Sequence, residues 1–394
     1  MNNEINKKIF VGLLSHYFVD SNLGCVALSI CNLLLIDKAA SELGYSVEYI
    51  ILVNEKIPQV PLNFTNSKYE YRVYSSSKET LKHPIRLMKT KIFEDCDFVF
   101  NLCAGDGFTD IYGKWRTFSE SYMTILGSFK NCKMILAPQT IGPFNSKICR
   151  QLARFTMNRC DYIFVRDNPS YKLCEEMGQS DKTKEVIDVA LALPYTKQKL
   201  NSGFNFGINV SGLLYNDDNN RFQLSFDYKE FIERLVSFGL DQNFNIHLIS
   251  HVNIETETGE DDYIACKEIH KKYPQTILVD RFESPIDAKN YISGLDLFSG
   301  ARMHATIAAI SSDIPVIPVA YSRKVNGLYG NLNYPYYIDA KNKDMSIEKA
   351  INQFQIYMNN INEIKETLEK SKVIYTKELT LYVEEIKNIF HDYI

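Results

Sequence analysis

Short apolar runs alternate with longer stretches of helical periodicity along most of this chain. Runs rich in β-branched and aromatic residues predict buried strands, and apolar residues repeating at every third or fourth position predict helices. In the first half we expect strands at residues 8–14, 46–53, 96–102, 133–137 and 162–165, a short sixth strand at 186–190, and helices at 25–43, 145–158 and 169–177. Residues 56–90 are polar and predict an irregular loop, with a basic helix near 82–91.

The same alternation restarts after a polar stretch at residues 194–203, which has the composition of a linker. Here we expect strands at 204–210, 245–250, 276–280, 295–299 and 315–320, and helices at 227–238, 261–272, 285–292 and 303–310. Strands that alternate with helices in this way indicate parallel sheets covered by helices on both faces.

Two such halves predict an α/β protein with two Rossmann-like, doubly wound domains facing a cleft, a GT-B-like architecture. We place the N-terminal domain, on the acceptor side, at residues 1–195 and the C-terminal domain, on the donor side, at 204–345. Residues 346–394 are helical and charged, and by analogy with that architecture we expect them to cross back to the first domain.

Composition and charge exclude some classes of protein. Of the 394 residues, 45 % are apolar and 23 % are charged, which is ordinary for a globular protein. The net charge of −4 argues against a broad nucleic-acid-binding surface, so we expect no nucleic-acid partner. The nine cysteines form no Cys-x-x-Cys pair, which favours reduced core cysteines over disulfides or a zinc site.

Nothing in the sequence has the layout of a secretory signal, and the longest nearly apolar stretch, residues 25–36, is too short to cross a bilayer. We therefore expect a cytoplasmic protein and leave contact with the inner face of the membrane open. A basic segment at residues 78–91 is one candidate for such contact, although a solvated loop is the plainer interpretation.

The strongest candidate for chemistry is the segment Ser-Gly-Ala-Arg-Met-His-Ala at residues 299–305, between a predicted strand and a predicted helix. The first turn of a helix has free N–H groups and a positive dipole end, so Gly300, Arg302 and His304 predict an anion site there. Arginine holds a carboxylate or a phosphate through two parallel hydrogen bonds. The alternative is a capped helix in which Arg302 makes a structural salt bridge.

Three further cationic or titratable residues follow predicted strands. Lys324 lies after the strand at 315–320, Arg166 after the strand at 162–165, and His251 after the strand at 245–250. The carboxyl ends of parallel strands are where open α/β sheets bind ligands, so each is a candidate. A solvated turn for Lys324, a surface pair with Asp167 for Arg166, and a structural histidine at His251 remain alternatives.

Polar and glycine-rich loops supply candidates for binding a neutral ligand. Their residues are Asn22, Gly105, Asp106, Asp110, Gln139 and Thr140. The two aspartates are candidates for a general base, and the other four for hydrogen bonds to sugar hydroxyls. Tight turns and helix caps are the competing interpretations. A P-loop, an H-E-x-x-H motif and a nucleophile elbow are absent from the sequence.

In combination these motifs resemble the polysaccharide pyruvyl transferase family. The resemblance runs from about residue 9 to residue 330 and rests on short segments in a fixed order: Asn22-Leu-Gly24, Gly105-Asp-Gly-Phe108 with Asp110, Pro138-Gln-Thr-Ile-Gly-Pro143, Val165-Arg-Asp167, Asp188, Ser250-His251, Gly300-Ala-Arg-Met-His-Ala305 and Tyr321-Ser-Arg-Lys324. The first loop of the family usually reads Asn-x-Gly-Asp, and Cys25 replaces that aspartate here.

The resemblance implies a GT-B-like fold, phosphoenolpyruvate as donor, and formation of a ketal on two hydroxyls of a sugar or oligosaccharide, with a lipid-linked acceptor left open. Arg302 and His304 match the Arg-x-His pair of the family, which is implicated in holding the donor, and Arg166 matches its Val-Arg-Asp arginine. We assign Arg302, Arg166, Lys324 and Gly300 to the donor and expect no cofactor or metal. We expect His304, or else His251, to be the general acid. A nucleotide-sugar glycosyltransferase of the same fold and a catalytically inactive sugar-binding protein remain alternatives.

Overall fold

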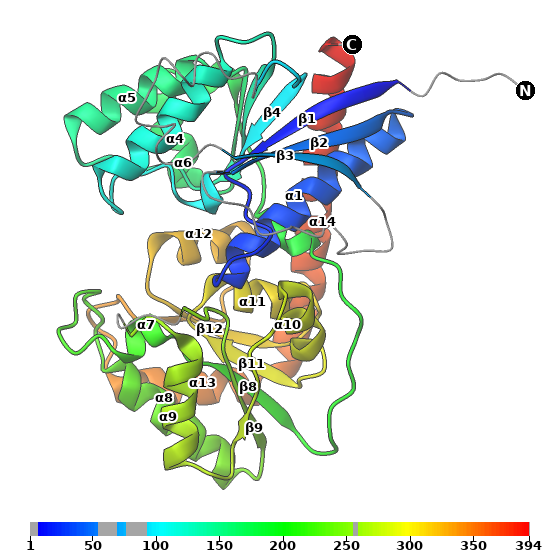
Figure 1. Cartoon of the computed structure of the whole chain (residues 1–394). Helices are drawn as coiled ribbons and strands as arrows, with labels where there is room; N and C mark the ends of the chain where they lie inside the picture. Colours follow the sequence, from blue (N-terminus) through cyan, green and yellow to red (C-terminus); the bar gives the residue numbers. More distant parts are fainter. Residues whose placement is uncertain (1–6, 54–68, 76–92, 255–258, 394) are drawn as a thin grey trace, which may run out of the picture. The chain divides into compact units, whose positions relative to one another are not determined.

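The computed structural model describes residues 7–53, 69–75, 93–254 and 259–393. The chain divides into two compact units, and each is built from several segments. Unit 1 comprises Met1–Val19, Leu28–Val189 and Lys377–Ile394, and unit 2 comprises Asp20–Ala27 and Ala190–Thr376. Figure 1 shows that each unit is a sheet with helices on both faces.

Unit 1 contains a seven-stranded parallel sheet with the order β3-β2-β1-β4-β5-β6-β7. Its strands are β1 (Lys8–Leu14), β2 (Ser46–Val53), β3 (Glu70–Ser75), β4 (Phe98–Asn101), β5 (Lys133–Gln139), β6 (Tyr162–Val165) and β7 (Thr183–Glu185). Strand order reverses between β1 and β4, as expected for a doubly wound sheet.

Helices cover both faces of this first sheet (Figure 1). α4 (Lys114–Gly127), α5 (Lys147–Asn158) and α6 (Asn168–Glu176) lie on one face, and α1 (Leu23–Glu42) and the end of α14 (Ile361–Tyr393) on the other. In α14, the ring of Phe390 packs on Phe98 and that of Tyr382 on Phe164. The last helix therefore completes the core of unit 1.

Among the described residues, helix α1 is the one helix that is both long and apolar enough to cross a membrane. By length and composition it could cross a membrane, but 78 % of its most apolar window is buried inside the protein. Its residue Asn32 sits in a buried chain of hydrogen bonds: its amide donates to Nε2 of His16 at 2.9 Å and its oxygen accepts from Tyr382 at 2.8 Å. The helix is thus a core element of unit 1.

Unit 2 contains a six-stranded parallel sheet with the order β10-β9-β8-β11-β12-β13. Its strands are β8 (Asn205–Asn209), β9 (Asn245–Ile249), β10 (Ile277–Leu278), β11 (Leu297–Gly300), β12 (Val316–Ala320) and β13 (Ile338–Asp339). Strand order reverses between β8 and β11, so this sheet has the same winding as the first.

The helices of unit 2 again form two layers (Figure 1). α8 (Tyr228–Asp241), α9 (Asp262–Lys272) and α13 (Ile347–Asn359) cover one face, and α10 (Pro285–Ile292) and α11 (Met303–Ile310) cover the other. Two further helices, α7 (Gly212–Tyr215) and α12 (Arg323–Asn331), follow β8 and β12. Both α7 and α12 therefore begin at the carboxyl edge of the sheet.

Most predicted elements are present, but helices α4, α7 and α12 and strands β3 and β13 were not predicted. The strand expected at 186–190 is wrong: Val189–Ala192 forms a 3-10 turn, and the strand is the polar Thr183–Glu185. Strand β3 falls where a loop was expected, because a strand at the edge of a sheet buries little and needs few apolar residues. The basic segment at 78–91 lies outside the described residues. Eight of the nine cysteines are buried and all nine are free thiols, as expected for core cysteines.

Candidate active site

A small cavity of about 70 Å³ lies at the carboxyl edge of the unit 2 sheet. Its lining comes from Asn22, His251, Val252, Arg302, Met303, His304, Tyr321 and Val325. These residues follow strands β9, β11 and β12, apart from Asn22, which precedes α1. The cavity is therefore next to the reversal of strand order between β8 and β11, the position where open α/β sheets bind ligands.

The loop before α1 is part of this site, although it comes from the start of the chain. Asn22 forms an antiparallel bridge with Val252, and the backbone N–H of Leu23 donates to the carbonyl of His251 at 3.2 Å. Gly24 lies directly against the imidazole of His304, so closely that a Cβ at Gly24 would overlap Nδ1 of that ring. The structure thus brings the loop at Asn22 together with two motifs that lie more than two hundred residues later in the sequence.

Three helices begin around the cavity. α1 begins at Leu23, and Asn22 caps it by accepting a hydrogen bond from the N–H of Gly24 at 3.0 Å. α11 begins at Met303 and α12 at Arg323, and each contributes first-turn residues to the lining. Because the N-terminus of a helix carries partial positive charge and free N–H groups, this arrangement favours an anionic ligand.

Arg302 is fixed in place by a buried carboxylate. Its Nη2 donates to Oδ1 of Asp262 at 2.8 Å and its Nε to both oxygens at 3.1 and 3.2 Å, while its backbone N–H donates to Asn209 at 3.0 Å. The side chain of Asp262 is fully buried and that of Arg302 is 14 % exposed. The guanidinium is therefore held rigidly and is still accessible at the cavity.

Asp262 is the centre of a larger network. Besides Arg302, its carboxylate accepts hydrogen bonds from the backbone N–H groups of Gly212 (2.9 Å), His251 (3.2 Å) and Val252 (3.1 Å). It therefore ties together the ends of β8, β9 and β11. Asp262 falls within the predicted helix at residues 261–272 and was not a candidate site residue, and Asp261 caps this helix.

His251 is buried beside the cavity. Neither of its ring nitrogens has a hydrogen-bond partner among the described residues, and the same holds for the hydroxyl of Ser322, the N-cap residue of α12. Burial, with smaller contributions from His304 and Arg302, lowers the pKa of His251 to about 3. Its imidazole is therefore neutral near pH 7, and it offers one donor and one acceptor.

The other predicted donor residues of unit 2 have different outcomes. Gly300 ends β11, and a Cβ there would lie 2.6 Å from Cβ of Asn209, so its role in the structure is to admit Asn209 beside Arg302. Lys324 falls in the first turn of α12, and its side chain lies outside the described part of the chain.

Four predicted residues meet at the carboxyl edge of the unit 1 sheet. Nη1 of Arg166 pairs with Asp188 at 2.7 Å, and its Nε donates to the hydroxyl of Thr140 at 3.1 Å. The N–H of Thr140 donates to the carbonyl of Gly105, a residue with φ +89°. Gln139 is buried, with its amide donating to Asn101 and Ala137.

The arrangement around Arg166 differs from the surface pair with Asp167 that was considered as an alternative. Asp167 instead caps α6 and accepts from Thr140 at 2.8 Å. The side chains of Arg166 and Asp188 are 4 % and 1 % exposed. The charge of Arg166 is thus balanced inside the unit by Asp188.

The two candidate bases of unit 1 are used differently. Both oxygens of Asp110 accept backbone N–H groups, from Asn145 at 2.9 Å and Ser146 at 2.7 Å, which holds the start of α5. Asp106 is half-buried and accepts from the hydroxyl of Tyr112 at 3.0 Å. Asp110 therefore has a structural role, and Asp106 is the better placed of the two for chemistry.

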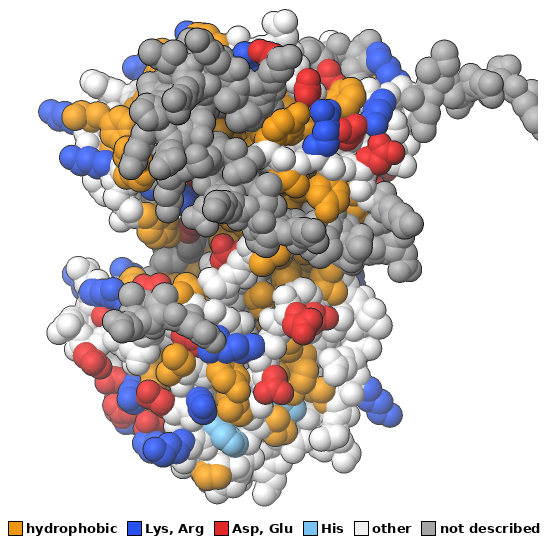
Figure 2. Space-filling model, in the orientation of Figure 1, with side chains coloured by type: hydrophobic (Ala, Val, Ile, Leu, Met, Phe, Trp, Pro, Cys, Tyr) orange, Lys and Arg blue, Asp and Glu red, His pale blue; other side chains and the backbone are white. Residues whose placement is uncertain are grey.

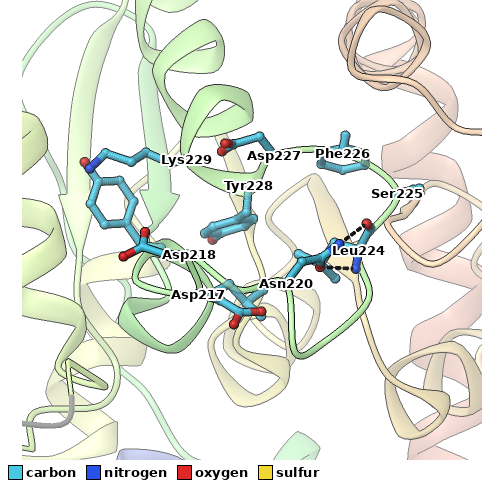
Figure 3. A pocket seen from close by; sticks show the side chains of 11 residues that line it. Asp217, Asp218, Asn220, Leu224, Ser225, Phe226, Asp227, Tyr228 and Lys229 are labelled. Atoms are coloured by element: carbon cyan, nitrogen blue, oxygen red, sulfur yellow. Dashed lines mark hydrogen bonds between the residues drawn. The ribbon is translucent and has the colours of Figure 1, made fainter.

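Unit 2 has a second, larger cavity of about 460 Å³ under the loop between α7 and α8, shown in Figure 3. Its polar side chains shape the loop: Asp217 accepts from two backbone N–H groups, Asn220 bonds twice to the backbone of Leu224, and Asp227 caps α8.

In the described ranges, no group of three or more His, Cys, Asp or Glu residues could hold a metal ion.

Solved structures with the same fold include a putative UDP-N-acetylglucosamine 2-epimerase from Listeria monocytogenes, with a TM-score of 0.64, 13 % identity, and coverage of 98 % of this chain and 97 % of that chain. An Anabaena protein solved with UDP and glucose has a TM-score of 0.60 and 10 % identity, with coverage of 97 % of this chain and 99 % of that chain. A glycosyltransferase from Rickettsia africae has a TM-score of 0.58 and 11 % identity, with coverage of 98 % of each chain. These confirm the predicted GT-B-like fold.

No curated protein sequence matches this chain. One family model matches residues 33–323, and its description is "Polysaccharide pyruvyl transferase".

Proposed function

Because the chain belongs to the polysaccharide pyruvyl transferase family, we propose that it transfers the pyruvate unit of phosphoenolpyruvate to two hydroxyls of one sugar. The product is a pyruvate ketal on a cell-surface polysaccharide or on its precursor. Phosphoenolpyruvate is the donor, no cofactor takes part, and the reaction is placed in the cytoplasm. A lipid-linked form of the acceptor is compatible with this proposal.

The observation that supports this donor is the convergence of Arg302 and three helix N-termini on one small cavity. Phosphoenolpyruvate carries a carboxylate and a phosphate on a three-carbon frame. Asp262 and the carbonyl of Glu260 occupy Nε and Nη2 of Arg302, so Nη1 of this rigid guanidinium can donate to either group, and helix N-termini can hold the other. Asp262 keeps the guanidinium oriented before the donor arrives, so little order is lost on binding.

The reaction needs a proton on the methylene carbon of the donor. We assign this proton to His304, which lines the cavity beside Gly24. His251 is less suited, since a pKa of about 3 leaves its imidazole neutral near pH 7. Its buried nitrogens are suited to orienting the donor by hydrogen bonds.

Protonation makes the central carbon of the donor electrophilic. One sugar hydroxyl adds to it and gives its proton to a general base, phosphate leaves as the second hydroxyl adds, and the second proton goes to phosphate. Two C–O bonds form, one C–O bond to phosphate breaks, and one C–H bond forms. Carbon, hydrogen and charge balance without water or an oxidant.

A nucleotide-sugar glycosyltransferase is the second candidate, because the Anabaena protein of the same fold was solved with UDP and glucose. A catalytically inactive sugar-binding protein is the third. A ligand stabilises only the state that it binds, so thermal shifts with phosphoenolpyruvate and with UDP-glucose distinguish the first two.

The decisive test is phosphate release from phosphoenolpyruvate with a panel of galactose-, glucose- and mannose-type acceptors. Wild type should release phosphate only with an acceptor. In Arg302→Lys, which keeps the positive charge facing Asp262 but loses the planar guanidinium, the rate of phosphate release should fall by about 100-fold. The matched control is Arg281→Lys, since Arg281 pairs with the neighbouring Asp261 at 2.8 Å. A thermal shift with UDP-glucose and none with phosphoenolpyruvate would overturn the proposal.

A further inference from the structure

One face of unit 1 exposes an unusual number of large apolar side chains. Seven of the thirteen exposed large hydrophobic residues in the described ranges fall between residues 111 and 155. Trp115, the only tryptophan of the chain, is 74 % exposed, and Phe129 and Ile148 are 62 % and 61 % exposed. Single exposed apolar residues are normal on a protein surface, but a cluster of this kind marks an interaction site.

The same stretch is strongly basic. Residues 111–160 contain eight Lys or Arg residues and a single carboxylate, although the whole chain has a net charge of −4. That carboxylate, Glu120, is buried and accepts a hydrogen bond from Ser15 at 2.8 Å. Four of the cations pair with carboxylates: Arg116 with Glu120, Lys130 with Glu94, Lys133 with Asp161 and Arg150 with Glu176. In the described ranges the other four, Lys114, Lys147, Arg154 and Arg159, make no ion pair with a carboxylate, so they supply the positive charge of this surface.

The apolar residues form stripes on two helices that pack against each other, α4 and α5. On α4 the stripe consists of Trp115 and Phe118, with Ile111 and Tyr112 in the turn before the helix, and on α5 it runs from Ile148 to Phe155, two turns apart. Residues spaced in this way share one face of a helix.

The two stripes are joined at both ends. At one end Asp110 binds the backbone of Asn145 and Ser146, which brings the loop at Ile111 to the start of α5. At the other end the guanidinium of Arg159 lies over the rings of Phe129 and Phe155, at 4.7 and 5.4 Å. Figure 2 shows hydrophobic side chains beside Lys and Arg side chains at the edge of unit 1.

A row of cations borders the α5 stripe. Lys147, Arg150 and Arg154 are spaced along the helix and line a hollow of about 210 Å³ with Glu176, which pairs with Arg150 at 3.0 Å. Lys147 and Arg154 are exposed. The hollow offers more cations than it has carboxylates, so it suits a phosphate group.

We propose that this face of α4 and α5 binds an anionic lipid bilayer. The aromatic and aliphatic side chains would enter the interfacial region, where tryptophan and tyrosine are favoured, and the cations would contact lipid phosphates. Aliphatic residues such as Ile111 and Ile148 have no stacking surface for a nucleic acid. The inference goes beyond the transfer reaction and does not depend on the donor. It would bring the enzyme to membrane-attached acceptors.

The single tryptophan makes the test direct, because Trp115 reports the proposed surface without a label. Emission should shift to shorter wavelength with vesicles of equal parts phosphatidylcholine and phosphatidylglycerol, and should stay unchanged with phosphatidylcholine alone. Lys147→Glu/Arg154→Glu should bind the anionic vesicles at least about tenfold more weakly. Lys267→Glu/Lys271→Glu, exposed on α9, makes the same charge change and should bind like wild type.

Apolar contact is tested separately by Ile148→Ser/Phe155→Ser, which keeps Trp115 and every cation. It should co-sediment less with anionic vesicles than Ile264→Ser/Ile356→Ser, whose positions are 43 % and 49 % exposed in unit 2. The proposal would be overturned if the α5 serine variant bound anionic vesicles as well as its unit 2 control, or if the α5 glutamate variant bound them as well as its α9 control. So would a tryptophan shift without vesicles as the protein concentration rises, because a second copy would then be covering the surface.

Discussion

Replacing Asp262 with asparagine should loosen the turn after β9 and release Arg302. The buried carboxylate accepts from Arg302 and from three backbone N–H groups. Asparagine keeps the size of the side chain but has one acceptor oxygen and no charge. Breaking a buried ion pair costs about 3–5 kcal/mol, and the partial exposure of Arg302 favours the lower value, about 3 kcal/mol.

Hydrogen–deuterium exchange measures this loss of stability at the amides that bond to Asp262. The amides of Gly212, His251 and Val252 donate to Asp262, so their protection should fall by about 100-fold in the variant, the equivalent of about 3 kcal/mol. Asp261→Asn is the control, because asparagine still caps α9 and the lost pair involves the more exposed Arg281. The reasoning fails if both variants raise exchange in these segments equally.

Three other changes follow from the structure. Gly24→Ala should cut turnover by about 100-fold by displacing the imidazole of His304, with the fold retained because alanine favours a helix. Asp188→Asn should lower the free energy of unfolding by about 3–5 kcal/mol, because Arg166 would be left buried without its partner; urea unfolding measures this. Acid should destabilise the protein, because the pKa of His251 is about 3 in the folded state and 6.5 in the unfolded state. Stability that is present above pH 6.5 is therefore lost as the pH falls towards 3, and urea midpoints at successive pH values measure this loss.

Each of these three has a matched control. Gly330→Ala changes a helical glycine with open space around it and should keep full turnover. Glu176→Gln breaks an exposed ion pair and should cost less than about 1 kcal/mol. His251→Gln should flatten the dependence of the urea midpoint on pH. An unchanged slope, a harmless Gly24→Ala, or equal costs for the two carboxylate variants would each contradict the corresponding argument.

The fold could be predicted largely because its core elements carry their own signals. The bounds of β1, β2, β6, α10 and α11 match the sequence prediction, since buried strands are continuously apolar and helices have period and caps. Strand β3 could not be found in this way. Its residues Glu-Tyr-Arg-Val-Tyr-Ser alternate with polar side chains because it has one neighbour in the sheet.

The candidate site was predictable only where its geometry is local. Arg302 and His304 follow a strand and open a helix, and that context alone indicates an anion site. Gly24 packs against His304, and Asp262 pairs with Arg302. Both contacts join distant segments, and a single sequence gives no signal for such contacts. Asp110 shows the reverse error, because a carboxylate in a polar loop resembles a base until its two backbone partners are known.

Neither unit is a continuous piece of chain, and this affects how the protein can be made. The core of unit 1 includes Phe390 and Tyr382, which leave the ribosome after every residue of unit 2. During synthesis unit 2 can be completed while the sheet of unit 1 still lacks its last covering helix. A nascent chain should therefore expose the apolar surface around Phe98 and Phe164 until the segment that carries Tyr382 and Phe390 has been made, which makes unit 1 the part that needs chaperone protection.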